Sequence, residues 1–528
     1  MAVPDGLSGF TRAPGCLGLS LDQPSPASGR NDNFRRVLAT GRKQGMSTRP
    51  APSLLLLQSI LLVSLATACA AHRGPAIPTA SSSASKGDTP YVVGLLPLRP
   101  TSPEAAAEAK TQQSLIEQAL ATLTPGTPIV VVHPDVQPPT SAEQASALAQ
   151  SAKVDELFWG EVSLENGKLS VRLQGFERTV NAPHGTWPME YTLADPAQRE
   201  ARELDALRVA QYLLEESLLP QMMRNRPTEV RQTLEVLVVR EPKDWVDWNS
   251  DIIHRRWGML GRLTRDGVLT EQRYRAALAE VAAQASSPPS SAALYKEAFF
   301  SAGLARGFLL QGKPQAAVEL LSDVVRRVPD ETDSRLLLGR AWLALGNRAE
   351  AAKVLEPLSQ QNANLETSRL YTVAVADQPE RVDAALARLQ EKQPEDMGVR
   401  LLRHVIAPSP ESTADLKAFT ASHPTAAWPL PVARYLLGEL DEQALWAAAK
   451  NADDHQERIQ NCQAHYLLGE AALSGVLPGR SGSPDRNEAR RHFEAAIATS
   501  AFHLPAYNLA DARLEQLALP EGTTSSQR

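Results

Sequence analysis

The chain of 528 residues is 43% hydrophobic and 22% charged, which is typical of globular proteins. Its net charge of −6 and pI near 6.0 give no sign of the basic stripe that nucleic-acid binding needs, so we expect no nucleic-acid partner. The length predicts roughly two to four domains, or one domain and a repeat array. Cys16, Cys69 and Cys462 lie far apart without a CxxC pair, which argues against a zinc site and against a disulfide framework.

The most apolar stretch is LLLLQSILLVSLATACAAH, from Leu54 to His72. Its apolar part, 54–68, is shorter than the about 20 residues of a membrane-spanning helix and has the length of the hydrophobic region of a signal peptide. Arg49 precedes it, and a linker rich in small residues and proline follows at 69–89. A buried helix is the alternative, but a core helix would lead into more core, whereas a tether leads into a linker of this kind.

The small residues before Cys69 resemble the lipobox of bacterial lipoprotein signal peptides. That family usually has leucine three positions before the cysteine; here the position is Ala66, with Leu65 one residue earlier. The resemblance implies cleavage after Ala68 and lipidation of Cys69. Because Ala70 and not aspartate follows, it also implies delivery to the outer membrane, with the protein facing the periplasm.

Residues 1–45 precede this signal and show no helical or strand periodicity. Met46 opens a signal peptide of ordinary length, 46–68, so we interpret 1–45 as a mis-assigned or disordered N-terminal extension. A long cytoplasmic n-region is the alternative interpretation.

The segment 90–222 predicts alternating strands and helices. Short apolar and β-branched runs indicate strands, and alanine-rich amphipathic stretches indicate helices. Asn166-Gly167 joins two alternating runs, which is the strongest short signal for a β-hairpin. The expected strands are 91–98, 128–134, 154–165, 168–178 and the edge segment 184–193, and the expected helices begin at Pro103, Ser141 and Leu204.

Several short motifs of this segment resemble the N-terminal domain of TolB and related TolB-like periplasmic domains. They are Leu95-Leu96-Pro97 at the end of the first strand, the glycine-centred strand 157–162, the strand 169–173 and the segment Gly185-Thr186-Trp187. The resemblance covers 90–222 and implies a small α+β domain that binds or scaffolds and does not catalyse. Four polar residues are candidates for a site in this domain, and we interpret them as loop or strand-edge residues: His133, Asp135, Glu161 and His184.

The second half of the chain repeats itself with a period of 34 residues, which is the tetratricopeptide (TPR) period. Gly312 and Gly346 are separated by this distance, as are Ala317 and Ala351. We expect two antiparallel helices per unit, with the glycine as a left-handed cap of the first helix and the alanine allowing close packing of the second. Pro329 closes the first unit. One unit cannot bury its apolar face alone, so the units are expected to stack.

The period continues into 378–394, where the turn glycine is missing, and this copy is degenerate. The pattern returns at Gly469 and Ala489. The spacing between these two residues is larger than that from Gly339 to Ala351, because a loop rich in Gly, Pro and Ser follows the first helix of the later unit.

The C-terminal segments resemble tetratricopeptide lipoproteins of Gram-negative outer membranes, which include periplasmic adaptors for proteases and cell-wall hydrolases. The resemblance covers 290–515 and implies that the first helix of each unit lines a concave groove. Arg306 and Arg340 occupy equivalent positions on these helices. We predict that they form a ladder for carboxylates of an extended partner peptide. The alternative is a pair of exterior or internally salt-bridged arginines.

We find no HExxH, P-loop, GxGxxG or GxSxG motif, and we therefore expect no enzyme activity, cofactor or metal. His455 and His465 flank Cys462, and we interpret this group as a buried helical cysteine with surface histidines. Trp245 and Trp248 lie at helical spacing; they indicate either a core stripe that caps the array or an aromatic docking patch.

The predicted fold is thus a small TolB-N-like α+β domain followed by an all-α TPR superhelix. The predicted function is a lipid-anchored periplasmic adaptor or scaffold that binds protein partners through the TPR groove. A structural subunit of an envelope assembly or secretion complex is one alternative, and an enzyme with a cryptic site in the α+β domain is another. The predicted segments are 1–45 extension, 46–68 signal peptide, 69–89 linker, 90–222 α+β domain, 223–290 helical connector, 291–515 TPR array and 516–528 disordered tail.

Overall fold

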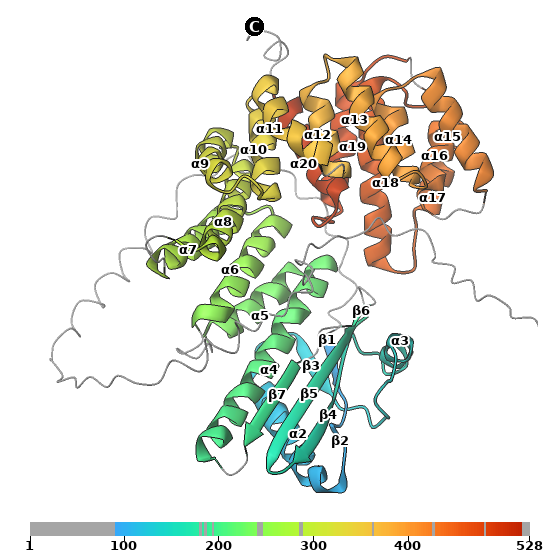
Figure 1. Ribbon diagram of the computed structural model, residues 1–528. Helices are drawn as coiled ribbons and strands as arrows, with labels where there is room; N and C mark the ends of the chain where they lie inside the picture. Colours follow the sequence, from blue (N-terminus) through green and yellow to red (C-terminus); the bar gives the residue numbers. More distant parts are fainter. Residues whose placement is uncertain are drawn as a thin grey trace, which may run out of the picture. The chain divides into compact units, whose positions relative to one another are not determined.

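The computed structural model describes residues 90–519 except 179–181, 184–186, 193–194, 240–245, 285–288, 362–363, 425–427 and 480–481. In this range a small mixed β-sheet is followed by a long run of helices (Figure 1). The predicted signal peptide, Cys69 and the linker lie outside the described residues.

The sheet has the strand order β3-β1-β4-β5-β6, with β2 paired to β4 and β7 paired to β5. Strand β1 pairs in parallel with β3 and β4, and β5 is antiparallel to β4 and β7. The strands are β1 Tyr91–Leu95, β2 Arg99–Pro100, β3 Ile129–Val132, β4 Glu156–Glu165, β5 Lys168–Glu177, β6 Ala182–Pro183 and β7 Trp187–Thr192.

The predicted hairpin joins β4 and β5, which pair from Glu156↔Glu177 to Glu165↔Lys168. Asn166 and Gly167 have φ of +51° and +75°. A two-residue turn with both φ positive matches the twist of the strands, and asparagine and glycine adopt this conformation at the lowest cost.

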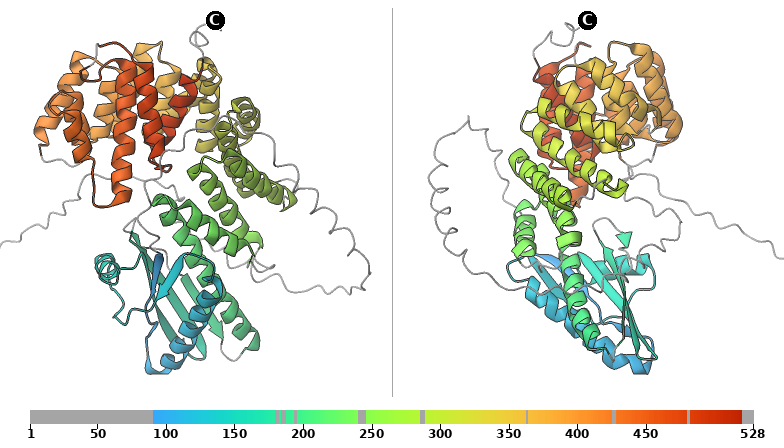
Figure 2. Two further views of the ribbon diagram at one scale, coloured as in Figure 1. Left: turned by 180° about the vertical axis from the view of Figure 1, so that it is seen from behind. Right: turned by 60° about the vertical axis from the view of Figure 1, so that its left-hand side comes forward.

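Helices cover both faces of the sheet (Figure 2). Helices α2 (Ala106–Leu123) and α4 (Pro196–Met223) pack side by side on one face, and α3 (Ala142–Ser151) covers the other. Strand β4 is buried on both faces because its side chains alternate: Phe158 points to the α2 and α4 side, and Leu157 to the α3 side.

The remaining helices follow one another along the chain, and most consecutive helices pack together. They are α5 Pro227–Val239, α6 Val246–Leu263, α7 Gly267–Gln284, α8 Ser291–Leu310, α9 Pro314–Arg327, α10 Thr332–Ala344, α11 Arg348–Gln361, α12 Leu365–Ala374, α13 Pro379–Lys392, α14 Met397–Ile406, α15 Pro410–Ser422, α16 Leu430–Leu436, α17 Glu442–Ala448, α18 Asp454–Ser474, α19 Arg486–Ala498 and α20 Pro505–Leu517, and a 3-10 turn, η1 Pro103–Ala105, precedes α2. This long run of helices is consistent with a TPR superhelix.

The two units with the 34-residue period are the pairs α8–α9 and α10–α11. Gly312 and Gly346 have φ of +68° and +77° at the ends of the first helices. The amide of Lys313 donates to the Phe308 carbonyl at 2.9 Å, and the equivalent bond from Asn347 to Trp342 has the same length. Each first helix therefore ends in a Schellman cap, which requires a left-handed residue at the glycine position.

Close helix contact in the units depends on small residues. Ala317, Ala351 and Ala489 are fully buried. A Cβ on Gly339 would lie 2.4 Å from Leu355 Cγ, and one on Gly469 would lie 2.5 Å from Phe493 Cε1. Both glycines thus allow a large side chain of the second helix to reach the backbone of the first. Pro329 follows α9 at an exposed turn.

Helix α20 does not simply extend the row of helices. It packs on α18 and α19, its neighbours in the chain, and also on α10 and α12 (Figure 1). Helix α20 therefore folds back against α10, the first helix of the second unit, and against α12. The helix continues to Leu517, two residues into the predicted tail; residues 520–528 lie outside the described part.

Candidate protein-binding face of the helical repeats

The two predicted arginines lie on neighbouring first helices, Arg306 on α8 and Arg340 on α10. Arg306 Nη2 is 3.2 Å from Asp333 Oδ2, at the start of α10. Arg340 is 8% exposed and is turned toward α20. The repeat geometry therefore gives both side chains the same helix position, but their surroundings differ.

Arg340 is bound to two carboxylates of the chain's own last helix. Its Nη2 lies 2.6 Å from Asp511 Oδ2 and 2.6 Å from Glu515 Oε1. Arg265 also reaches Asp511, at 2.8 Å. Burial alone would raise the pKa of Asp511, but Arg340 and Arg265 outweigh it and hold that pKa below its ordinary value. Arg340 is therefore an internally salt-bridged arginine, which is the alternative interpretation of the predicted ladder.

A second buried charge cluster fixes the other side of α20. Glu470 of α18 lies 2.5 Å from Arg369 Nη2 of α12 and 3.1 Å from Arg513 Nη2 of α20. Burial raises the pKa of Glu470, but the two arginines more than compensate and lower it. Charges buried this deeply are tolerated only when they are paired, and these pairs link α20 to α18 and α18 to α12.

Helix α8 carries exposed aromatic side chains on the side that holds Arg306. Tyr295 is 46% exposed and Phe299 is 37% exposed. The guanidinium of Arg255, on α6, lies 5.3 Å from the Phe299 ring centroid. Tyr295, Phe299 and Arg306 are spaced four and seven residues apart, so they lie along one side of α8. We call Tyr295, Phe299, Arg255 and Arg306 the α8 patch.

Sequence reasoning did not find the aromatic part of this patch. Tyr295 and Phe299 belong to an alanine- and phenylalanine-rich helix, where a spacing of four residues is equally typical of core positions, as for buried Phe300 and Leu304. The sequence indicates the docking of α20 only weakly. Asp511 and Glu515 are four residues apart, but carboxylates with this spacing are also common on solvated helices.

The polar candidates of the α+β domain do not converge. His133 pairs with Glu117 at 3.5 Å and is half exposed, and Asp135 and Glu161 are exposed as well. His184 lies outside the described residues, as do Trp245 and the side chain of Trp248.

The cysteine and histidines of α18 do not form a nucleophile pair. Cys462 is fully buried, which raises the pKa of its thiol to about 12. His455 Nδ1 lies 2.9 Å from the Met223 carbonyl oxygen, and His465 Nδ1 lies 3.1 Å from His492 Nδ1. In the described segments no group of three or more His, Cys, Asp or Glu side chains is placed to hold a metal ion.

The fold defines a protein with a small mixed-sheet domain and a helical-repeat region. A family model described as tetratricopeptide repeat matches residues 308–376, from the end of α8 to the end of α12. The predicted TPR repeats are confirmed there, and TPR repeats as a class bind protein partners. A comparison with curated proteins gives no match. Among the residues that the structure describes, no helix is both long and apolar enough to cross a membrane.

Proposed function

We propose that this protein is a lipid-anchored scaffold of the cell envelope whose TPR region holds a protein partner against the α8 patch. The TPR match supports binding of a protein. The observation that carries the proposal is the contrast between Arg340, bound to two carboxylates of α20, and Arg306, which stands at the equivalent repeat position on a helix with exposed aromatic side chains.

The contact of α20 with Arg340 of α10 is an internal example of the kind of segment that we expect the first helices of the repeats to bind. Helix α20 offers Arg340 two carboxylates four residues apart. We therefore expect the partner segment to be acidic and amphipathic, with carboxylates directed at Arg306 and Arg255 and apolar side chains on Tyr295 and Phe299. Charge-assisted pairs set the orientation, and aromatic contacts provide most of the affinity.

Photocrosslinking in intact cells tests this proposal. A photoreactive amino acid replaces Phe299 in one strain and Tyr295 in a second; the control strain carries it in place of Arg326, an exposed residue of α9, the second helix of the same unit. We expect one protein to be crosslinked from both aromatic positions and not from position 326. Equal crosslinking from all three positions, or none from the aromatic positions, contradicts the proposal.

The lipid anchor and the location are part of the same proposal. Sequence 54–69 supports cleavage after Ala68 and lipidation of Cys69, and 90–222 is proposed to be TolB-like on its strand and helix order. A labelled fatty-acid precursor is expected to enter the wild-type protein and not the Cys69→Ala variant, and the protein is expected in the outer-membrane fraction. Catalysis is not part of the proposed role.

A further inference from the structure

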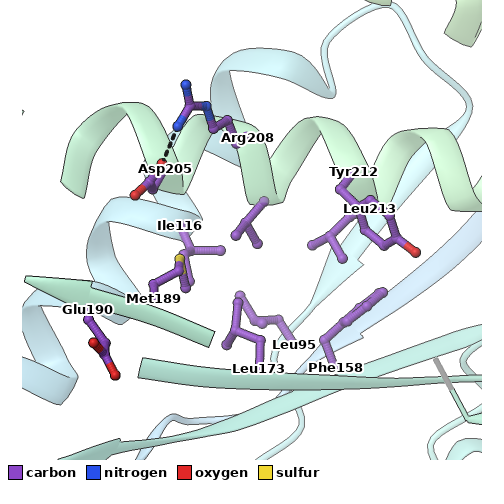
Figure 3. A pocket seen from close by; sticks show the side chains of 11 residues that line it. Leu95, Ile116, Phe158, Leu173, Met189, Glu190, Asp205, Arg208, Tyr212 and Leu213 are labelled. Carbon is purple, nitrogen blue, oxygen red and sulfur yellow. Dashed lines mark hydrogen bonds and ion pairs between the residues drawn. The ribbon is translucent and has the colours of Figure 1, made fainter. Parts of the chain in front are cut away.

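A cavity of about 420 Å³ lies within the α+β domain, between the sheet and helix α4 (Figure 3). Strands β1, β4 and β5 contribute Leu95, Phe158 and Leu173, and Ile116 comes from α2. Val209 and Leu213 line it from α4, four residues apart and therefore on one side of that helix. Its volume falls in the ~300–1,000 Å³ range of small-molecule sites.

The cavity is open on one side: Glu190 and Arg208 of its lining are exposed, whereas Leu95, Ile116 and Phe158 are buried. Because protein interiors are close-packed, an apolar hollow that reaches core side chains leaves them short of packing partners. Water would fill the cavity poorly, because a water molecule needs two to four polar partners and, of the strand side chains in the lining, only Glu190 of β7 is polar. A ligand with an apolar body would recover the missing packing contacts.

Polar groups stand on the helix side and at the rim of the cavity. Asp205 Oδ1 accepts from Arg208 Nη1 at 2.7 Å, and its Oδ2 accepts from the Tyr191 hydroxyl at 3.0 Å. Figure 3 shows Asp205 and Arg208 toward one end of the helix side and Tyr212 and Leu213 toward the other. The lining runs from position 205 to 213 of α4, a length of roughly 12 Å at 1.5 Å per residue.

From this arrangement we infer that the cavity binds one acyl chain of an amphiphile, with the polar end of the ligand at the Asp205–Arg208 ion pair. The elongated lining and its many branched aliphatic side chains suit a linear hydrocarbon chain. The chain is either that of a free fatty acid or lysolipid or that of the lipid on Cys69. The second source rests on the proposed lipidation.

Binding is measured with cis-parinaric acid, a linear fatty acid whose fluorescence rises in apolar surroundings, on the full-length Cys69→Ala protein without detergent. We expect saturable binding at one site per chain and a rise in the thermal unfolding midpoint on addition of the probe. Val209→Phe fills the cavity from the helix and is expected to weaken binding at least about tenfold, which corresponds to about 1.4 kcal/mol. Val268→Phe, at an exposed position of α7, is the matched control and is expected to bind normally.

Met189→Phe fills the same cavity from β7 and provides a second test in case Val209→Phe does not fold. Absence of saturable binding overturns the inference, and so does unchanged binding by either folded cavity-filling variant. The source is identified with a photoreactive fatty acid added to wild-type and Cys69→Ala proteins in lipid nanodiscs. If the cavity is labelled equally in both proteins, it binds free amphiphiles. If it is labelled only in Cys69→Ala, the anchor of the wild-type protein occupies it. The mass of the wild-type N-terminal peptide reports lipidation separately.

Discussion

Arg340 and Glu515 are 175 positions apart in the sequence, yet the two side chains form a bidentate ion pair with N–O distances of 2.6 and 3.1 Å. The pair joins α10 to α20, and Asp511 binds the same guanidinium one turn earlier. The last helix of the described residues is thus held on α10 and α12, within the region that carries the TPR match.

Replacing Arg340 tests how strongly this contact holds the helix. Arg340→Met removes the charge but keeps most of the aliphatic volume, so Glu515 loses its cation and buried Asp511 keeps only Arg265. We expect the free energy of unfolding to fall by about 3–5 kcal/mol in urea titrations followed by circular dichroism. Arg326→Met, at an exposed pair on α9, is the control and is expected to change stability by less than about 1 kcal/mol. A similar small loss for both variants would show that the Arg340 cluster contributes little.

Buried histidines predict acid sensitivity where α4 meets α18. Neither ring nitrogen of His503 has a hydrogen-bond partner among the described residues, and its ring lies 5.4 Å from that of His455. Burial, His455 and the nearby Arg458 and Arg262 lower the pKa of His503 to about 3 from its ordinary 6.5. Burial, reinforced by Arg458, also lowers the pKa of His455.

The sign of the effect follows from proton binding. Below pH 6.5 the unfolded chain binds protons at these histidines and the folded chain does not, so stability falls with decreasing pH, down to about pH 3 for His503. Each histidine can change the free energy of unfolding by at most about 1.4 kcal/mol per pH unit. His503→Gln is expected to reduce the slope of unfolding free energy against pH between 6 and 4, because it removes a group whose pKa is lowered in the folded chain. An identical slope for His503→Gln and wild type would rule out this role.

The burial of Cys462 predicts that its thiol reacts slowly in the folded protein. Its thiol is fully buried and burial raises its pKa to about 12, so very little thiolate forms at neutral pH. In a background of Cys16→Ser and Cys69→Ala, we expect no detectable reaction with a thiol reagent over hours in native buffer. Complete reaction within minutes is expected in denaturant. Rapid labelling of the native protein would show that α18 opens readily or that the thiol is exposed.

Local and periodic signals made much of this fold predictable. The Asn166-Gly167 hairpin depends on two residues that tolerate positive φ, and the 34-residue spacing of Gly312 and Gly346 reports two identical helix caps. The TPR match at 308–376 confirms the repeat there. Such features depend on neighbours in the sequence, and they can be recognised without the tertiary structure.

The docking of α20 and the cavity beside Val209 could not be predicted in this way. Asp511 looks like any helical surface carboxylate until Arg340, 171 positions earlier, is placed beside it. Val209 and Leu213 have the spacing of an ordinary core stripe, and the sequence does not show that the space opposite them is left unfilled. Both features depend on distant segments meeting in three dimensions.

Binding of an acidic, amphipathic partner segment by the α8 patch is tested most directly by affinity measurements. The partner identified by crosslinking at Phe299 is titrated with purified full-length variants. Arg306→Glu is expected to weaken binding about tenfold or more, because it places a carboxylate opposite the carboxylates of the partner. Arg326→Glu, the same charge change on the second helix of the unit, is expected to leave the affinity within about twofold of wild type. Equal affinity of the folded Arg306→Glu and Arg326→Glu variants would contradict binding of the partner at the α8 patch.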